Sequence, residues 1–182
     1  MNTAASIESL LTDLAAEHAA LDDVVAAIDD DAWDTPTPAA AWTVRDQIGH
    51  LAFFDAAAAR AVRDPAGFAA ERDVAMAGLG AYMARAEGSV RQLPPVELLA
   101  EWRSGRGDML GAFEPLDATA RIEWYGPTMS ARSFLTARLM ETWAHGLDVA
   151  DGLGVAYPAT PGCGMWPTSV SPPGAGVSWC GA

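Results

Sequence analysis

The sequence predicts an all-α protein, a bundle of helices joined by short links. Apolar residues recur at three- and four-residue steps in several segments, which is the period of amphipathic helices. Prolines and glycines separate these segments. Composition then limits the helical part, because all 24 acidic and 11 basic residues lie at or before Asp151. We therefore expect one helical domain over residues 1–155 and an irregular, disordered tail over residues 156–182.

The first two helices are indicated by periodicity and by a cap. Apolar residues keep a helical spacing from Ile7 to Ile28, and a loop with two prolines then ends the pattern. Thr43 and Asp46 have the spacing of a capping box, with Asp in place of the usual Glu. The second helix is therefore expected from Thr43 to about Arg63, with Asp46 in the first turn, where the helix dipole favours a carboxylate.

Three later segments complete the helical part. Residues 68–93 have the pattern of one helix that Gly78 and Gly80 weaken. A further helix is expected over residues 96–113, and the last helix from about Ala131 to Ala150. Short links between these segments favour neighbouring helices that pack on one another as a bundle.

The net charge excludes several classes of partner. A formal charge of -13 repels phosphate backbones and anionic lipid, and no basic stripe offsets it. No uncharged apolar run before Asp151 reaches the length of a membrane span, and the first residues lack the positive start of a secretory signal. We therefore expect a cytoplasmic protein that binds neither nucleic acid nor membranes.

The chain has three histidines, His18, His50 and His145, in different contexts. His18 follows Glu17 and is expected to lie off the main apolar stripe, solvated. His50 is placed among apolar residues of the second helix and should border the core, where an unpaired imidazole is costly.

A metal site is one explanation for the other two histidines. Glu141 and His145 are four residues apart, so both lie on one helical face, and His50 from a second helix would complete a site with open positions. Two His and one Glu suit catalytic zinc, and also Fe(II), Ni or Mn. A Glu–His pair at this spacing is also common as a surface hydrogen bond. Asp148, one turn further on, could accept a hydrogen bond from a ligand histidine or act as an extra ligand.

Two motifs together resemble the metal-binding N-terminal domain of mycothiol-dependent maleylpyruvate isomerases, in the DinB-like superfamily. They are WTVRD followed by HL over residues 42–51, and ETWAH followed by DVA over residues 141–150. The resemblance covers residues 5–155. It implies a DinB-like four-helix bundle with an extra helical insertion between the second and third core helices. It also implies a divalent metal, usually zinc, bound by His50, Glu141 and His145.

The resemblance further implies a small-molecule substrate or thiol as partner. In such proteins the metal activates water or a low-molecular-weight thiol, mycothiol, for isomerisation or thiol transfer. Arg45 and Arg138 are candidates to bind a carboxylate on that substrate or cofactor, although such arginines often pair with an aspartate, for which Asp46 and Asp13 are at hand. Similar bundles often form homodimers. A non-catalytic binding or oligomerisation module, or an inactive truncated product, is the alternative.

The tail is where the chain departs from this family, whose members continue with charged helical sequence. It contains five prolines and both cysteines, Cys163 and Cys180. From the third base of the Gly162 codon, GC-rich codons for this stretch can also spell a charged, helix-compatible peptide. We therefore hypothesise that residues after about Pro161 are read in a shifted frame. Resequencing of the locus tests this, since an unambiguous in-frame read would exclude it.

Overall fold

The computed structural model describes residues 6–160. The hypothesis about the tail and both cysteines therefore lie outside the described residues. The elements in chain order are α1 (Ile7–Val25), the 3-10 helix η1 (Asp30–Asp34), α2 (Val44–Arg63), α3 (Pro65–Ala77), α4 (Leu79–Arg91), α5 (Pro95–Phe113), β1 (Arg121–Ile122), β2 (Met129–Ser130) and α6 (Ala131–Leu153).

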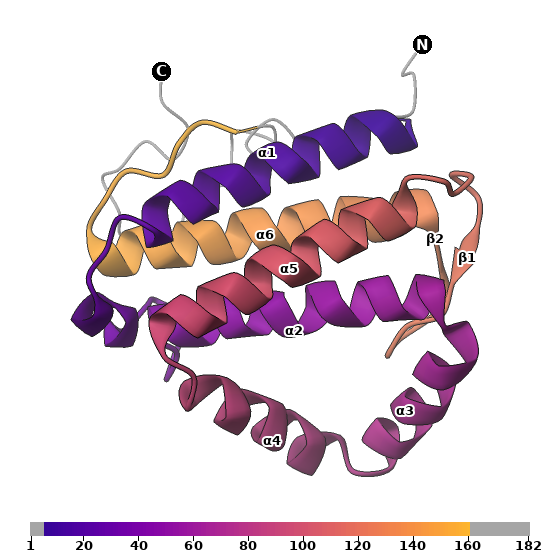
Figure 1. The fold of residues 1–182 in the computed structure, drawn as a ribbon, viewed down its shortest axis with the longest axis horizontal. Helices are drawn as coiled ribbons and strands as arrows, with labels where there is room; N and C mark the ends of the chain where they lie inside the picture. The colour runs from indigo at the N-terminus through magenta and orange to yellow at the C-terminus, as the bar shows by residue number, and fades with distance from the viewer. Residues whose placement is uncertain (1–5, 161–182) are drawn as a thin grey trace.

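Four long helices form the bundle, as predicted. α1 packs against α6, α2 packs against α5, and α2 and α6 join the two pairs. α3 and α4 form the expected insertion between the second and third core helices, on the outer side of α2 (Figure 1). The two short strands pair antiparallel, with Arg121 opposite Ser130. In the part of the chain that the structure describes, no helix is long and apolar enough to cross a membrane.

The helix ends follow the local chemistry of the sequence. The expected capping box is present at α2, where the Thr43 N–H donates to Asp46 Oδ2 at 2.9 Å. α1 ends at Val25 rather than Ile28, because the acidic stretch that follows forms η1. The single helix expected over residues 68–93 is two helices that break at Gly78, a residue with high helix-breaking tendency.

The prediction for His18 was wrong, because this side chain is 2% exposed and lies inside the bundle. His18 Nε2 is 3.5 Å from Asp55 Oδ2, and Trp102 Nε1 donates to the same oxygen at 3.2 Å. Arg138 completes this buried polar cluster with an ion pair of 2.8 Å to Asp55 Oδ1. Burial opposes ionisation of Asp55, but Arg138 and His18 outweigh it and lower the pKa of its carboxyl. Asp55, the charged neighbour of His18, comes from another helix, α2.

The chain beyond α6 packs back on the bundle as far as Tyr157. The Tyr157 hydroxyl donates to Glu17 Oε1 at 2.7 Å. The Tyr157 ring packs against one of the two apolar core clusters. Gly146 in α6 provides the space for this ring, since a Cβ there would lie 2.5 Å from Tyr157 Cζ.

Replacing Gly146 with alanine is expected to destabilise the bundle by about 1–3 kcal/mol, the usual cost of forcing extra atoms into a packed site. Gly107 is the matched control, because it lies inside α5 with nothing within 4 Å of an added Cβ. There alanine should stabilise the helix by about 0.5–1 kcal/mol. Urea unfolding measures both. Equal effects of the two substitutions would show that Tyr157 does not occupy this position.

Candidate metal centre

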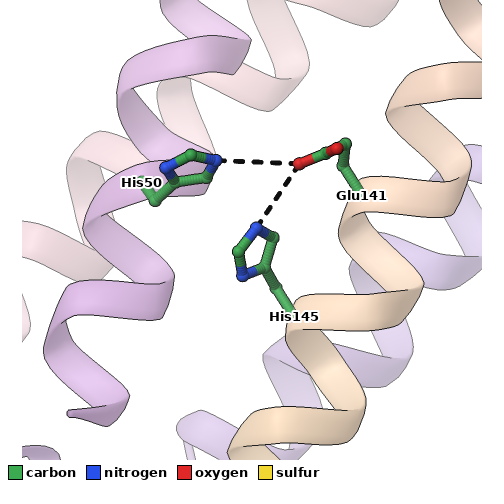
Figure 2. Close-up of side chains that lie close together, drawn as sticks. All are labelled: His50, Glu141 and His145. Carbon is green, nitrogen blue, oxygen red and sulfur yellow. Dashed lines mark ion pairs between the residues drawn. The ribbon is translucent and has the colours of Figure 1, made fainter. Parts of the chain in front are cut away.

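The candidate centre lies between α2 and α6, two core helices in contact. α2 supplies His50, whose neighbours Ile48 and Leu51 are fully buried and fix the rotation of this helix. α6 supplies Glu141 and His145, one turn apart. Figure 2 shows the three side chains converging from the two helices. The structure therefore brings together the three residues that the sequence singled out.

The donor atoms of the three residues are close enough to share one cation after small side-chain adjustments. His50 Nε2 and His145 Nε2 lie 3.7 and 3.4 Å from the same oxygen, Glu141 Oε2. All three donors lie within 4.8 Å of one another, and no other such group occurs among the described residues. Donors bound to zinc at about 2.1 Å in a tetrahedron are roughly 3.4 Å apart, so both distances to Glu141 fit.

Electrostatics favours the forms of these side chains that bind a cation. The neighbouring imidazoles of His145 and His50 hold the pKa of the Glu141 carboxyl well below its usual range, so it is ionised at neutral pH. Burial lowers the pKa of His50. Its imidazole is therefore neutral near pH 7 and keeps a lone pair for a metal ion.

Gln47, which is completely buried, contacts the candidate ligand His145 of α6. Its Oε1 contacts His145 Nδ1, while its Nε2 donates to Thr37 Oγ1 at 2.9 Å and to Asp148 Oδ2 at 3.3 Å. The amide oxygen therefore faces the imidazole, which places the proton on Nδ1 and leaves Nε2 free for a cation. Asp148, for which the sequence left open a hydrogen bond from a ligand histidine or a role as an extra ligand, accepts a hydrogen bond from this amide.

Gln47 was missed by the sequence reasoning, although a signal was present. It follows Val44 by three residues and precedes Ile48, and both of these apolar neighbours are fully buried. A polar side chain on such a stripe needs a partner inside the protein. The sequence could therefore have marked Gln47 as a buried side chain that needs a partner, but not His145 as that partner.

A cavity of about 280 Å³ opens beside His50 and Glu141. Apolar side chains of α2, α6, β2 and the link before it form most of its remaining wall: Phe54, Trp124, Met129, Phe134 and Ala137. The Phe54 ring lies 4.6 Å from the His50 ring, between centroids, and Trp42 stacks on His145 at 5.8 Å. The candidate centre thus faces a small, mostly apolar chamber.

Arg138 lines this cavity, whereas Arg45 does not. Arg138 Nε and Nη2 both donate to Asp55 Oδ1, at 3.2 and 2.8 Å. Its Nη1 has no hydrogen-bond acceptor within residues 6–160. Arg45 donates instead to Asp34 at 2.9 Å and to the carbonyl of Leu93 at 2.6 Å, so its partner is neither of the two expected aspartates. A binding role for Arg45 stays a prediction.

Residues 14–150 match the family described as Mycothiol maleylpyruvate isomerase N-terminal domain. The chain belongs to this family. The match runs from α1 into α6 and includes all three residues of the candidate centre. It confirms the resemblance that two short motifs had indicated.

The chain is also similar to proteins from Mycobacterium tuberculosis. Uncharacterized proteins from two strains of Mycobacterium tuberculosis, CDC 1551 / Oshkosh and ATCC 25618 / H37Rv, are each 47% identical over 150 residues, which is 82% of this chain. The chain spans 58% of the length of each.

Two crystal structures of mycothiol-dependent maleylpyruvate isomerase, one of a histidine-to-alanine mutant, superpose with a TM-score of 0.65 at 16% and 15% identity. They cover 81% of this chain, which matches 62% of theirs. At these identities the likeness establishes the fold, and the DinB-like bundle is confirmed.

Proposed function

We propose that this chain binds one divalent metal ion, zinc in the first place, through His50, Glu141 and His145. The observation that supports this proposal is that the donor atoms of the three residues, which come from two helices, converge beside a cavity. Three protein ligands with open positions are typical of catalytic zinc, whereas structural zinc has four. The same donors also suit Fe(II), Ni and Mn, so zinc is the first of several metals to test.

The metal ion would activate water or a low-molecular-weight thiol such as mycothiol by lowering its pKa. The side chains around it have separate tasks. Gln47 holds His145 in the tautomer that binds metal. The apolar wall offers contacts to the apolar part of a substrate, and Arg138 Nη1 offers a donor to a carboxylate on the substrate or thiol. We therefore propose an isomerase or thiol transferase acting on a small molecule.

Metal analysis of the purified chain tests the binding step. Protein prepared without chelator, or dialysed against zinc after chelator treatment, is expected to hold about one equivalent, as plasma emission spectrometry would measure. Less than about one-tenth equivalent, with no uptake of Zn or Ni, would reject the proposal in favour of a non-catalytic module. Turnover of maleylpyruvate that requires mycothiol tests the reaction separately, and its absence would remove the isomerase assignment alone.

Replacing Gln47 with leucine is expected to weaken zinc binding by about 10–100-fold, the usual effect of losing a hydrogen-bond partner of a ligand histidine. Competition with a chromophoric chelator measures the affinity. Thr37→Val is the control, because it removes a partner of the Gln47 amide and leaves the contact with His145 in place. An unchanged affinity in Gln47→Leu would show that His145 needs no orientation by the amide.

A further inference from the structure

A second cavity, of about 480 Å³, lies between α2, α5 and the α3–α4 insertion. Its volume is within the usual range of small-molecule sites. We propose that this chamber, called here the insertion cavity, binds a small organic cation, an amine with an aromatic or aliphatic body. None of the three candidate metal ligands lines it, so this proposal is independent of the metal centre.

The insertion creates this cavity. α3 leaves the end of α2 and α4 returns toward the start of α5, so that the two inserted helices bridge the ends of α2 (Figure 1). The α2 side chains that line the space include Ala52, Ala56 and Ala57. Gly105 lines it from α5, where an added Cβ would lie 3.5 Å from the Ala52 carbonyl oxygen. Small side chains at this crossing leave a space that the insertion covers without filling.

Aromatic rings form one side of the insertion cavity. Phe53 lies 5.9 Å from Tyr82 and 6.5 Å from Tyr125, and Phe68 lies 5.3 Å from Tyr125, between ring centroids. Burial and a hydrogen bond with Tyr82 raise the pKa of the Tyr125 hydroxyl, which therefore stays neutral. Neutral aromatic faces attract cations and pack against apolar groups.

The same aromatic residues separate this cavity from the one beside the metal centre. Phe53 contacts Phe54 at 5.0 Å, and Tyr125 contacts Trp124 at 5.1 Å. Phe53 and Tyr125 line the insertion cavity, whereas Phe54 and Trp124 line the other. A ligand in one chamber therefore meets a different set of side chains from a ligand in the other.

Charges at the insertion cavity select the ligand class. Glu71 pairs with Arg60 at 2.7 Å, and Asp108 pairs with Arg63 at 2.7 Å, so these carboxylates are compensated. Glu101, the third carboxylate of the lining, has no cationic partner among the described residues. Among the described side chains, the lining therefore carries one unbalanced negative charge, on the exposed Glu101, in addition to its aromatic residues. A monovalent amine balances this charge, whereas an anion would be repelled.

The proposal is tested with phenethylamine and two analogues of similar shape, neutral 2-phenylethanol and anionic 3-phenylpropionate. Isothermal titration calorimetry at pH 7 is expected to give one phenethylamine site with the tightest binding of the three, and the same affinity in protein with zinc and after chelator treatment. Glu101→Gln should weaken phenethylamine about fivefold, the loss of one ion pair, and leave 2-phenylethanol unchanged. Glu97→Gln, an exposed acid one turn earlier on α5, should change neither.

Ser104→Phe provides a second test, because this exposed α5 residue lines the cavity and a larger side chain there would fill it. It should abolish phenethylamine binding while thermal stability and zinc content stay unchanged. Binding no tighter than that of 3-phenylpropionate, or binding that survives both Glu101→Gln and Ser104→Phe, would overturn the proposal. Binding that disappears on removal of zinc would assign the amine to the metal centre and overturn it equally.

Discussion

Replacing Asp55 with alanine is expected to lower the free energy of unfolding by about 3–5 kcal/mol, the cost of removing one partner from a buried ion pair. Asp55 is 0% and Arg138 4% exposed, so the guanidinium would lose its carboxylate partner in a place that is largely buried. Trp102 Nε1 would lose its acceptor as well. Urea unfolding followed by circular dichroism measures the change.

Two comparisons make this result specific. Asp108→Ala breaks an ion pair of similar length, 2.7 Å, on the surface, and is expected to cost less than about 1 kcal/mol. The double substitution Asp55→Leu with Arg138→Met should be less destabilising than Asp55→Ala, because no unpaired charge stays buried. If Asp55→Ala cost no more than Asp108→Ala, the buried polar cluster would not exist as described.

The second large effect is expected at the metal centre. Zinc sites have apparent binding free energies of about 10–16 kcal/mol shared among their ligands, so loss of one ligand should cost about 3–4 kcal/mol, a factor of about 10²–10³ in affinity. His50→Ala, Glu141→Ala and His145→Ala should each show this loss in a competition assay. They should also lose the rise in melting temperature that zinc gives the unchanged protein.

Asp151→Asn is the matched control for these variants, since it removes an exposed carboxylate from the same helix, beyond the cluster. It should keep full zinc affinity. A His145→Ala variant that retained one equivalent of zinc would show that the ligands are assigned wrongly, even if the chain binds metal elsewhere.

Local signals in the sequence were sufficient to predict most of the fold. Apolar periodicity and the capping box at Thr43 placed α2 correctly, because both depend on residues close in sequence. His18 shows where such signals fail. Leu14 and Leu21 lie four residues before and three after it, so its spacing already placed it on the buried stripe. Its polarity argued for solvent, and the partner that reverses this argument, Asp55, is distant in sequence.

In the candidate site, too, some features could be predicted from local spacing and others could not. Glu141 and His145 could be paired from their spacing, and His50 could be added as a third ligand from a second helix. Spacing does not report which helices pack together, so it was the family resemblance that favoured this set over a surface hydrogen bond. Gln47 could not be assigned a role at all without the position of His145. The partner of Arg45 was mispredicted for the same reason, since Asp34 is brought to it by η1 rather than by a helical turn.

The middle of α2 contacts three different parts of the domain, which limits the mutations that it can tolerate. Within six residues, His50 faces the candidate centre, Phe53 the insertion cavity and Asp55 the buried polar cluster. Successive residues of an α-helix are rotated by about 100°. Deleting or adding one residue between His50 and Asp55 would rotate one half of α2 relative to the other, so at least one of these three residues would leave its surroundings. This stretch can therefore vary by substitution but not in length.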